Sequence, residues 1–426
     1  MSFLEITFLG GCQTVGGSGV FISDGKTNVL IDYGVYMGRK EKPMPNLPPD
    51  KVDAVFLTHA HLDHVGATPI LYDENHETSP PVYVTPPTQG LLPLLIDDML
   101  KIKKFPFGKR EERRMLGRAR LVNYGDFVKV GSIKVKIINS GHIPGAYSAL
   151  IEADGKRIFY TSDFNTRATR LVQNADFNGI KPEVVIIEST YALEEHPERL
   201  ETEKALVNAI METVENGGVV LIPAFAVARS QEILCVLERY NLNYSYSITL
   251  DGMARDASRI LLQYPDYLKD YESLLRALSN CKWVRRFHDR VEAVSRPGVV
   301  VSTAGMLKGG PTIHYMRMLA KDPENAVFLV SFQVPGTPGR LLLDTGYFPL
   351  YGKPERVNAQ VRFFNFSSHA DGKQIRQVIE TLNHNNSPIY FTMHGEKEAC
   401  RALAEEIQEK YDKEAITPKA GETYEI

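Results

Sequence analysis

The sequence predicts an α/β protein in which a second α/β unit interrupts the first. Residues 4–188 alternate short apolar runs with glycine turns, which is typical of a strand-rich region. From Glu194 the pattern changes to long helices that alternate with buried strands, as in a parallel α/β unit. The strand-rich style returns near Val361. We therefore expect a first domain of residues 1–193 and 358–426, and an inserted second domain of residues 194–357.

The strands expected in the first part are rich in apolar and β-branched residues and are bounded by turn residues. They are Leu4–Leu9, Gly19–Ser23, Asn28–Asp32, Ala54–Thr58, Val82–Thr85, Ile133–Asn139, Ala149–Glu152, Ile158–Thr161 and Val184–Glu188. Four polar residues end or directly follow strands in this set: Asp32, His59, Asp163 and Glu188. A polar side chain at the end of a buried strand is well placed to enter a shared site.

The inserted part begins with a long helix, Glu201–Glu215, which Asn216 and two glycines terminate. A buried strand, Val219–Pro223, follows. This part continues with a helix at Ser230–Tyr240 and strands at Val299–Thr303 and Ala326–Phe332. The C-terminal part of the first domain is expected to hold strands at Val361–Phe366 and Ile389–Thr392 and helices at Asp371–Asn383 and Glu396–Tyr411.

Composition excludes several classes of protein. The formal net charge of −3 indicates no global affinity for nucleic acid or membranes, so a polyanion would need local basic patches. The four cysteines form no C-x-x-C pair, which argues against a disulfide framework or a thiolate metal site and fits a reducing, cytoplasmic setting. We expect no signal peptide and no membrane partner, because the N-terminus lacks a basic region and no segment stays apolar long enough to span a bilayer.

The run from His59 to His64 carries the strongest chemical signal. His59 and His61 follow an apolar strand, and residues two apart in an extended segment point the same way. If a helix begins near Leu62, Asp63 and His64 turn toward a second ion. With 11 histidines in 426 residues, the spacing H-x-H-x-x-H arises by chance on the order of 0.01 times. We therefore prefer a metal site, since imidazole and carboxylate donors suit hydrolytic zinc, to a loop of solvated histidines.

Two ions need more ligands than this run supplies. His142 and Asp163 each follow a strand, and each on its own would be an ordinary turn residue. Beside the histidine run, both become candidate ligands. Asp163 could bridge two ions, because a carboxylate has two oxygens whereas an imidazole has one free lone pair.

These residues resemble, in order, the four motifs of the metallo-β-lactamase superfamily: Leu30–Gly34, His59–His64, His142 and Asp163. The resemblance implies a four-layer αββα sandwich with a dinuclear metal site at one edge of its sheets. Glu188–Tyr191, Phe366–Asp371 and Met393–Glu396 are similar to motifs A, B and C of its β-CASP branch, as are Ile222–Glu232 and Val301–Pro311 to intervening segments. The nearest resemblance is to archaeal homologues of the endonuclease subunit of the cleavage and polyadenylation specificity factor, here without KH domains.

The resemblance also implies a role for each site residue. One zinc ion would be held by His59, His61 and His142, a second by Asp63, His64 and His394, and Asp163 would bridge them. A hydroxide held by the ions would be the nucleophile, because zinc lowers the pKa of bound water to roughly 7. His369 would be the general acid, Glu188 would favour its charged form, and Asp32 would orient a ligand. In this branch, a histidine in motif C, here His394, is typical of RNA-cleaving members, whereas DNA-cleaving members usually lack it.

Further residues are expected to contact the substrate. The turn at Lys308–Pro311 precedes a helix and either offers backbone N–H groups to a phosphate or is a plain helix start. Other expected substrate contacts are Ser302, Gly305, Arg229, Ser367 and Ser368.

Two basic clusters with interleaved aromatic residues suit RNA backbone neutralisation and base stacking. Residues 101–120 hold nine lysines and arginines, with Phe105 and Phe107 among them, and a second cluster holds Lys282, Trp283, Arg285, Arg286 and Arg290. The alternative for each cluster is a solvated surface.

Three functions follow as hypotheses. The first is a zinc-dependent ribonuclease that cuts single-stranded RNA internally, from the 5′ end, or both. The second is a small-molecule hydrolase such as a thioesterase or lactamase, which would need no inserted domain. The third is a catalytically silent partner in an RNA-processing complex, which the intact ligand set argues against. A symmetric homodimer through the C-terminal segment is also implied by the resemblance.

Overall fold

The computed structural model describes residues 4–36, 42–74, 79–383 and 387–426. The chain divides into two compact units. The first unit comprises Met1–Ala168, Gln173–Glu195 and Ser368–Ile426. The second comprises Thr169–Val172 and His196–Ser367. The second unit is thus almost entirely an insertion into the first.

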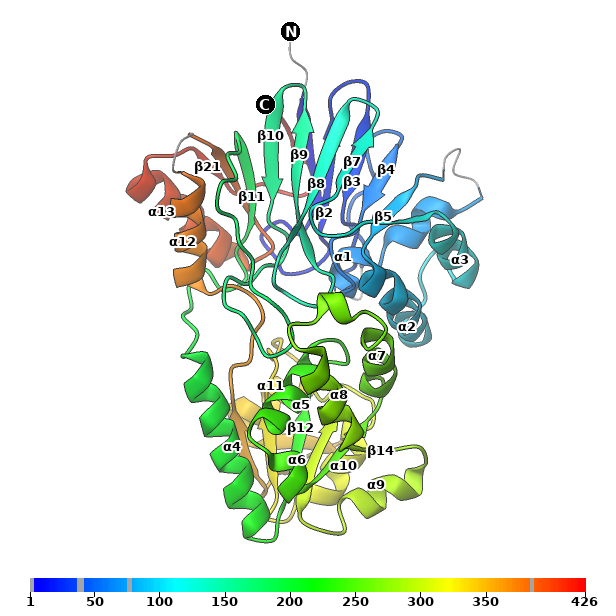
Figure 1. Cartoon of the computed structure of the whole chain (residues 1–426), viewed down its shortest axis with the longest axis vertical. Helices are drawn as coiled ribbons and strands as arrows, with labels where there is room; N and C mark the ends of the chain where they lie inside the picture. Colours follow the sequence, from blue (N-terminus) through cyan, green and yellow to red (C-terminus); the bar gives the residue numbers. More distant parts are fainter. Residues whose placement is uncertain (1–3, 37–41, 75–78, 384–386) are drawn as a thin grey trace. The chain divides into compact units, whose positions relative to one another are not determined.

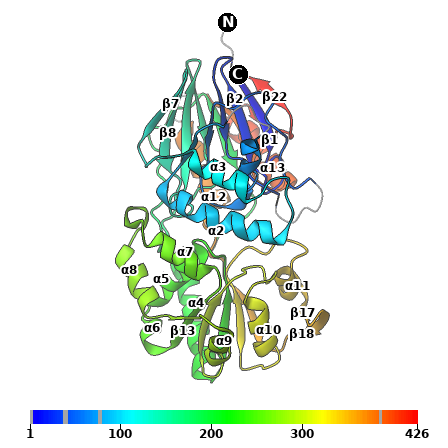
Figure 2. The ribbon, with the colours of Figure 1, turned by 90° about the vertical axis from the view of Figure 1, so that its right-hand side faces the viewer.

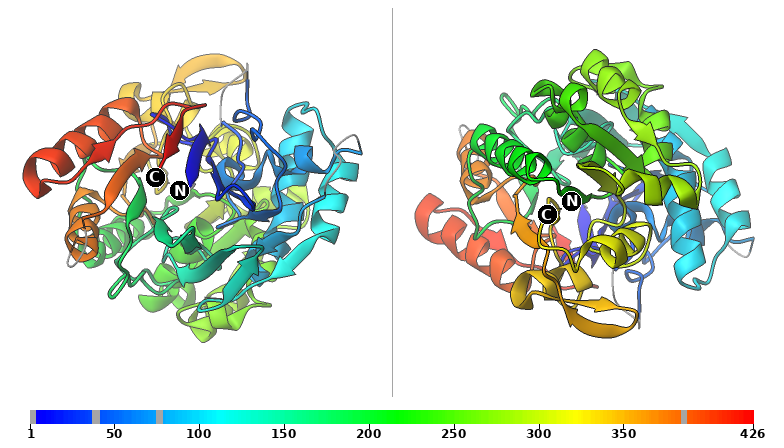
Figure 3. Two further views of the ribbon diagram at one scale, coloured as in Figure 1. Left: turned by 90° about the horizontal axis from the view of Figure 1, so that it is seen from above. Right: turned by 90° about the horizontal axis from the view of Figure 1, so that it is seen from below.

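The first unit contains two seven-stranded sheets, with the orders β22-β1-β2-β3-β4-β5-β6 and β21-β20-β11-β10-β9-β8-β7. The strands of the first sheet are β1 (Glu5–Gly10), β2 (Gly19–Ser23), β3 (Asn28–Ile31), β4 (Ala54–Phe56), β5 (Val82–Val84), β6 (Ala119–Leu121) and β22 (Thr423–Glu425). Those of the second are β7 (Phe127–Val130), β8 (Ile133–Asn139), β9 (Tyr147–Ala153), β10 (Lys156–Tyr160), β11 (Val184–Glu188), β20 (Ile389–Met393) and β21 (Ala415–Ile416). The C-terminal strand β22 pairs with β1 and closes the first sheet (Figure 3).

Period-two alternation places the apolar side chains of these strands in separate layers. In β3, Val29 and Ile31 belong to the cluster between the two sheets, whereas Leu30 belongs to the cluster under the helices. That outer cluster joins the first sheet to α2 (Pro86–Ile102) and α3 (Lys109–Gly117), while α12 (Gly372–Leu382) and α13 (Lys397–Tyr411) cover the second sheet. The two helix layers lie on opposite sides of the sheets, which makes this unit the expected αββα sandwich (Figure 1).

The second unit is built on a six-stranded sheet with the order β14-β13-β15-β12-β16-β19. Every pair in it is parallel, and its central strands β12 and β15 are buried along their whole length. Continuous runs such as Val299–Val301 suit this position because both faces of a parallel sheet are covered. The strands are β12 (Val219–Pro223), β13 (Ser247–Asp251), β14 (Lys282–Trp283), β15 (Gly298–Ser302), β16 (Ala326–Leu329) and β19 (Gln360–Phe363).

Helices and a hairpin surround this sheet. On one face, α10 and the hairpin β17–β18 pack against Val300 and Val327 through Tyr315 and Phe348, and Figure 2 shows the two elements on the same side. The helices are α4 (Arg199–Glu215), α5 (Arg229–Arg239), α6 (Leu242–Ser245), α7 (Ala254–Leu261), α8 (Tyr271–Ser279), α9 (Phe287–Ala293), α10 (Thr312–Leu319) and α11 (Pro338–Thr345). The hairpin strands are β17 (Tyr347–Leu350) and β18 (Lys353–Arg356).

Most expected elements are present with ends shifted by one to three residues. One element lies in a different unit from the expected one. The strand expected at Val361–Phe366 falls within residues 358–426 of the expected first domain. In the structure this strand is β19, and it pairs with β16 in the second unit. Its apolar run is similar to the strands of both units, so only its pairing partner distinguishes them. The second unit instead ends at Ser367.

None of the helices in the part of the chain that the structure describes combines the length and the apolar character needed to cross a bilayer.

Candidate metal centre

Strand ends bring the candidate ligands of the first unit together. The short helix α1 (Leu62–Val65) follows β4 after a tight turn and carries Asp63 and His64, with His61 at its N-cap. The other candidates follow the ends of β8, β10 and β20: His142, Asp163 and His394. β10 and β20 both run parallel to β11, and β8 runs in the same direction because two antiparallel pairings separate it from β10. Their carboxyl ends therefore meet at one edge of the sheet.

The ligand atoms form groups of the size that a metal ion requires. One group consists of His59, His61, His142 and Asp163, and a second consists of Asp63, His64 and His394; within each, the donor atoms lie within 4.8 Å of one another. Asp163 links the two groups. Its Oδ2 lies 3.5 Å from Nε2 of His59, 3.7 Å from Nε2 of His142 and 3.3 Å from Nε2 of His64.

Hydrogen bonds on the far side of two rings aim their other nitrogen at the centre. His64 Nδ1 lies 2.8 Å from Asp32 Oδ2, and His142 Nδ1 lies 3.0 Å from the carbonyl oxygen of Ser368. Because both acceptors take a proton from Nδ1, Nε2 is the nitrogen of each ring that faces the cluster and binds a metal ion when it is unprotonated. Pairing of this kind, of an imidazole with a carboxylate or a carbonyl, is the usual outer support of metal-binding histidines.

Two buried polar atoms in this cluster have no hydrogen-bond partner: His59 Nε2 and Asp163 Oδ1. Leaving a buried polar group unpaired costs about 1–3 kcal/mol. The Thr58 hydroxyl lies 3.2 Å from His59 Nδ1, whereas His59 Nε2 faces Asp163 at 3.5 Å, and the other oxygen of Asp163 lies 3.3 Å from His64 Nε2. A cation bound among nitrogen and oxygen donors would satisfy both atoms, so the residues present fit a metal ion.

The Asp32 carboxylate is a buried anchor for this edge of the sheets. It accepts hydrogen bonds from the backbone N–H of Thr58 at 2.8 Å, the Thr58 hydroxyl at 2.9 Å and the Tyr160 hydroxyl at 3.0 Å, in addition to His64. It is fully buried, and its φ of +56° is a left-handed conformation that Asp tolerates better than most residues. Asp32 therefore ties the end of β3 to the end of β4 and to a candidate ligand.

Burial and neighbouring charges set the protonation states of the cluster. Burial lowers the pKa of His61 to about 4 and also lowers the pKa values of His59 and His142. Burial alone would raise the pKa of Asp163, but nearby histidines, His394 first, hold it well below its usual value. Neutral imidazoles and an ionised carboxylate are the forms that bind metals. His64 differs: burial disfavours its charge, yet Asp163 and Asp32 raise its pKa, so metal binding would displace a proton there.

A second pair of residues stands beside the cluster. His369 Nδ1 lies 2.9 Å from Glu188 Oε2, and the other oxygen of Glu188 accepts the backbone N–H of Phe164 at 2.9 Å. Burial lowers the pKa of His369, but Glu188 and Asp163 outweigh this effect and raise the pKa to about 9. Its Nε2 is 3.9 Å from Asp163 Oδ2. These carboxylates therefore favour the protonated form of His369, whose side chain is 19% exposed and adjoins the candidate metal ligands.

Comparisons with known proteins agree with this geometry. A Beta-Casp domain matches residues 230–342, a Zn-dependent metallo-hydrolase RNA specificity domain matches residues 354–418, and a beta-lactamase superfamily domain matches residues 27–206. RNase aCSPSF2 of Saccharolobus solfataricus is 36% identical over 99% of this chain and 84% of its own length. The chain belongs to the β-CASP branch of the metallo-β-lactamase superfamily.

Other relatives of this β-CASP protein are also archaeal. Probable RNase MJ4 of Methanocaldococcus jannaschii is 36% identical over 99% of this chain and all of its own length. Transcription termination factor FttA of Methanosarcina mazei is 34% identical over 96% of this chain and 69% of its own length. A crystal structure of a protein of unknown function from Enterococcus faecalis V583 shares the fold, with a TM-score of 0.63 at 18% identity over all of both chains. The chain is therefore a metal-dependent hydrolase of the β-CASP family.

The expected substrate contacts are divided between the two units. Ser302, Gly305, Lys308 and Arg229 follow or end β15 and β12 in the second unit, and Ser367 also belongs to it. Ser368 belongs to the first unit, where its carbonyl oxygen supports His142. In the second unit, the carbonyl oxygen of Gly305 accepts a hydrogen bond from the side-chain amide of Gln333. As substrate contacts of a β-CASP enzyme, these six residues remain predictions.

The first basic cluster is less available to RNA than its sequence suggests. Phe107 is buried in the core under α3, and Phe105 packs against that core with its ring stacked 5.3 Å from Phe107. Neither ring is an open platform for a base. Arg110 and Arg114 both pair with Glu74, at 2.7 and 3.3 Å. The exposed cations of the cluster include Lys104, Arg113 and Arg118.

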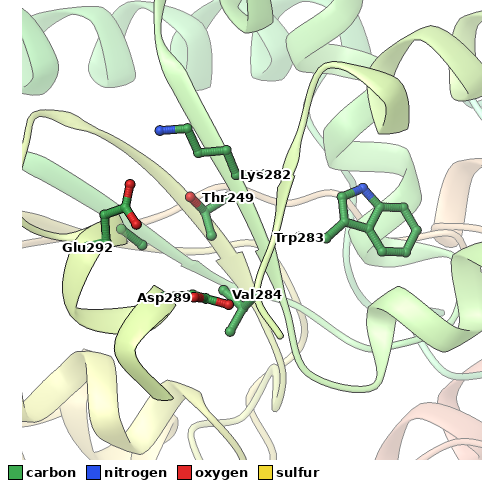
Figure 4. Close-up of a pocket in the computed structure, with 7 residues that line it drawn as sticks. Thr249, Lys282, Trp283, Val284, Asp289 and Glu292 are labelled. Atoms are coloured by element: carbon green, nitrogen blue, oxygen red, sulfur yellow. The ribbon is translucent and has the colours of Figure 1, made fainter. Parts of the chain in front are cut away.

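The second basic cluster is partly structural, although Lys282, Arg285 and Arg286 are exposed. Arg290 forms an ion pair at 2.6 Å with Asp251, which is fully buried, and the Trp283 indole donates to the carbonyl of Leu278. A pocket of ≈ 240 Å³ nearby is lined by Thr249, Lys282, Trp283, Val284, Asp289, Glu292 and Ala293. In Figure 4 the indole points away from Lys282 and Glu292, so the lining combines both signs of charge without an aromatic platform.

Sequence patterns did not reveal three hydroxyl-bearing residues of this site: Thr58, Tyr160 and Thr190. Thr58 and Tyr160 bind the Asp32 carboxylate, and Thr190 bonds to Glu188 and His394. Each lies on or within two residues of a strand end that also supplies a charged site residue. That position is the one signal in the sequence that could have identified them.

We expect substitution of Asp32 to weaken metal binding while the fold persists. Asp32→Asn replaces an acceptor-only carboxylate with an amide that cannot satisfy all four donors, so His64 loses its support. Removing such an outer partner typically lowers metal affinity about 10- to 100-fold. Tyr160→Phe removes one of the four hydrogen bonds and should have a smaller effect. Competition with a chelator, followed by metal analysis, measures both; equal affinities in Asp32→Asn and the wild type would refute the anchoring role.

Proposed function

We propose that this chain is a zinc-dependent ribonuclease that holds two zinc ions and hydrolyses phosphodiester bonds of single-stranded RNA. The observation that carries the proposal is the junction of two donor groups at Asp163, with His369 Nε2 at 3.9 Å from its carboxylate. Two related proteins named as RNases support it, and each is 36% identical over 99% of this chain. The match to an RNA specificity domain supports RNA as the substrate.

The proposed ligand assignment follows the donor groups. His59, His61 and His142 would hold one ion, Asp63, His64 and His394 the other, and Asp163 would contribute to both. Zinc is favoured because every donor is an imidazole or a carboxylate, a set that suits hydrolytic zinc sites. When bound, the ions would activate water and stabilise negative charge on the phosphate.

The protein's own residues would supply the proton and would fix the position of the atom that donates it. Glu188 holds Nδ1 of His369, which leaves Nε2, 3.9 Å from Asp163, as the proton donor to the leaving oxygen. Fixed hydrogen bonds to both oxygens of Glu188 prevent the pair from rotating. Asp32 would act more remotely, by keeping His64 in its ligating orientation.

Several finer statements belong to this proposal. We expect endonucleolytic cleavage, 5′–3′ exonucleolytic cleavage, or both, in RNA processing or decay, within the cytoplasm. The chain would act as a homodimer or within an RNA-processing complex. We assign residues 1–193 and 368–426 to the metallo-β-lactamase domain and residues 194–367 to the β-CASP domain, because β19, which lies within residues 358–367, pairs with β16.

The alternative, a small-molecule hydrolase of the thioesterase or lactamase type, would use the same metal centre. It leaves the second unit of the chain without a purpose, and the relatives described above are named as RNases or as a transcription termination factor.

Cleavage of a labelled RNA in the presence and absence of a chelator tests the proposal directly. We expect fragments that disappear with the chelator and return with added Zn²⁺. His394→Ala should abolish cleavage and lose one of the two ions, because it removes a donor of the second group. Intact RNA together with thioester or lactam turnover would instead establish the alternative function.

Variation of the leaving group tests the acid role of His369. We expect His369→Ala to slow cleavage of RNA while both ions remain bound. A phosphodiester with a nitrophenolate leaving group needs little protonation, so its hydrolysis should be much less affected. Equal losses for both substrates would contradict a role as general acid.

The exposed cations of the first basic cluster are expected to contact the RNA backbone. Arg113→Glu with Arg118→Glu should weaken RNA binding and flatten its salt dependence, since each phosphate contact contributes to the salt slope. Neither arginine touches the metal cluster, so zinc content should stay unchanged. Arg401→Glu, on α13 in the opposite helix layer, is the matched control. RNA affinity equal to that of the control at moderate salt would remove this surface from the proposed path.

A further inference from the structure

Thr190 connects the proton donor to a candidate metal ligand. Its hydroxyl oxygen lies 2.6 Å from Glu188 Oε2, which also holds His369. The same oxygen lies 2.8 Å from the carbonyl oxygen of His394 and 3.2 Å from its Nδ1. One hydroxyl group therefore lies between the Glu188–His369 pair and the ring of His394.

The number of protons limits how these contacts can form. A hydroxyl group has one proton to donate and two lone pairs that accept. Glu188 Oε2 and the His394 carbonyl only accept, and the 2.6 Å distance to the carboxylate is typical of a charge-assisted bond. Whichever of the two takes the proton, the hydroxyl oxygen remains an acceptor toward His394 Nδ1. That nitrogen must then carry the ring's proton.

The consequence for His394 is a defined ligand atom. With the proton on Nδ1, Nε2 keeps its lone pair, and it lies 3.5 Å from Asp63 Oδ2 and 3.2 Å from His64 Nε2. The reverse arrangement, in which Thr190 donates to Nδ1, would put the ring proton on Nε2 and block coordination. The hydroxyl contact thus favours the tautomer that can bind a metal ion.

Asp163 is the other group near this nitrogen. Its Oδ1 lies 3.2 Å from His394 Nδ1, the same distance as Thr190, yet it has no hydrogen-bond partner. Thr190 alone of the two meets the angular requirements of a hydrogen bond. By engaging Nδ1, Thr190 leaves Asp163 Oδ1 available to an ion. Without the hydroxyl, the ring proton would have the Asp163 carboxylate as its remaining acceptor, in competition with metal binding.

A backbone contact adds to this arrangement. His394 has a φ of +50°, and its N–H donates to the carbonyl of Gly11 at 2.7 Å. The Thr190 hydroxyl oxygen also lies 2.8 Å from the His394 carbonyl oxygen, and its single proton serves either this carbonyl or Glu188. In both cases its lone pair faces the ring of His394, so the tautomer is the feature that Thr190 determines.

We infer that Thr190 is a positioning residue whose hydroxyl group holds His394 as an Nε2 ligand and couples it to the Glu188–His369 pair. The inference rests on the proposed ligand role of His394 and does not depend on RNA being the substrate. It predicts a defect in binding of the second ion and in turnover when the hydroxyl is removed.

The matched variants are Thr190→Val, which removes the hydroxyl at similar volume, and Thr190→Ser, which retains it. Each is equilibrated with Zn²⁺ against a competing chelator, and bound metal is counted. We expect Thr190→Val to bind the ion of the Asp63, His64 and His394 group about 10- to 100-fold less tightly, the usual effect of removing an outer partner. Thr190→Ser should behave like the wild type, and kcat should fall in the valine variant with KM unchanged.

Two results would overturn the inference. One is wild-type affinity of Thr190→Val for both ions, and the other is an equal loss in Thr190→Ser and Thr190→Val, which would assign the effect to packing. Circular dichroism monitors folding, and Thr190→Ala against Thr190→Ser repeats the comparison if the valine variant is unstable. His394→Ala separates the two proposals: if it retains both ions, the ligand assignment fails, and if it loses one while Thr190→Val loses none, only the role of Thr190 fails.

Discussion

The buried carboxylate of Asp163 is the constraint around which the rest of the site is arranged. A carboxylate with no access to water is costly unless opposite charge or hydrogen-bond donors surround it. Here the surroundings are four imidazoles, those of His59, His64, His142 and His369, whose Nε2 atoms lie 3.3–3.9 Å from one oxygen of Asp163. The αββα sandwich makes this convergence available because parallel strands end at a common edge. A metal ion would complete the charge balance that the polypeptide alone leaves unfinished at His59 and Asp163.

Outside that centre, the supporting contacts separate into two systems with different tasks. Asp32, Thr58 and Tyr160 are fully or almost fully buried, and they hold the end of β4 and the His64 ring. Glu188 and Thr190 hold His369 and His394 on the side where His369 is partly exposed. The first system keeps ligands still, whereas the second keeps a proton donor next to them. A hydrolase of phosphodiesters needs both, because charge develops on phosphorus-bound oxygens while the leaving oxygen takes up a proton.

Charge outside the site illustrates how a pattern can mislead. Residues 101–120 are strongly basic in sequence, but α3 turns Phe107 and Met115 into the core and pairs two of its arginines with Glu74. In the second unit, Arg290 neutralises a buried aspartate. A count of cations in a window cannot show which of them have carboxylate partners, because those partners come from distant parts of the chain. Exposed cations such as Arg113 and Arg118 remain on this surface, whereas the aromatic rings beside them are not open to a base.

Local pattern was sufficient for the secondary structure around the site, since strand ends and the start of α1 depend on neighbours in the chain. It was also sufficient to nominate His59 to His64, because that spacing is rare and follows an apolar strand. His142 and Asp163 were candidates because each follows a strand, whereas His394 came from family resemblance alone, and the folded chain places all three within reach of that run. Membership of β19 in the second sheet, the partners of the basic residues and the contacts of Thr190 were beyond prediction. Each of these depends on long-range pairing, in which the partner is separated by up to hundreds of residues and leaves no mark on the local sequence.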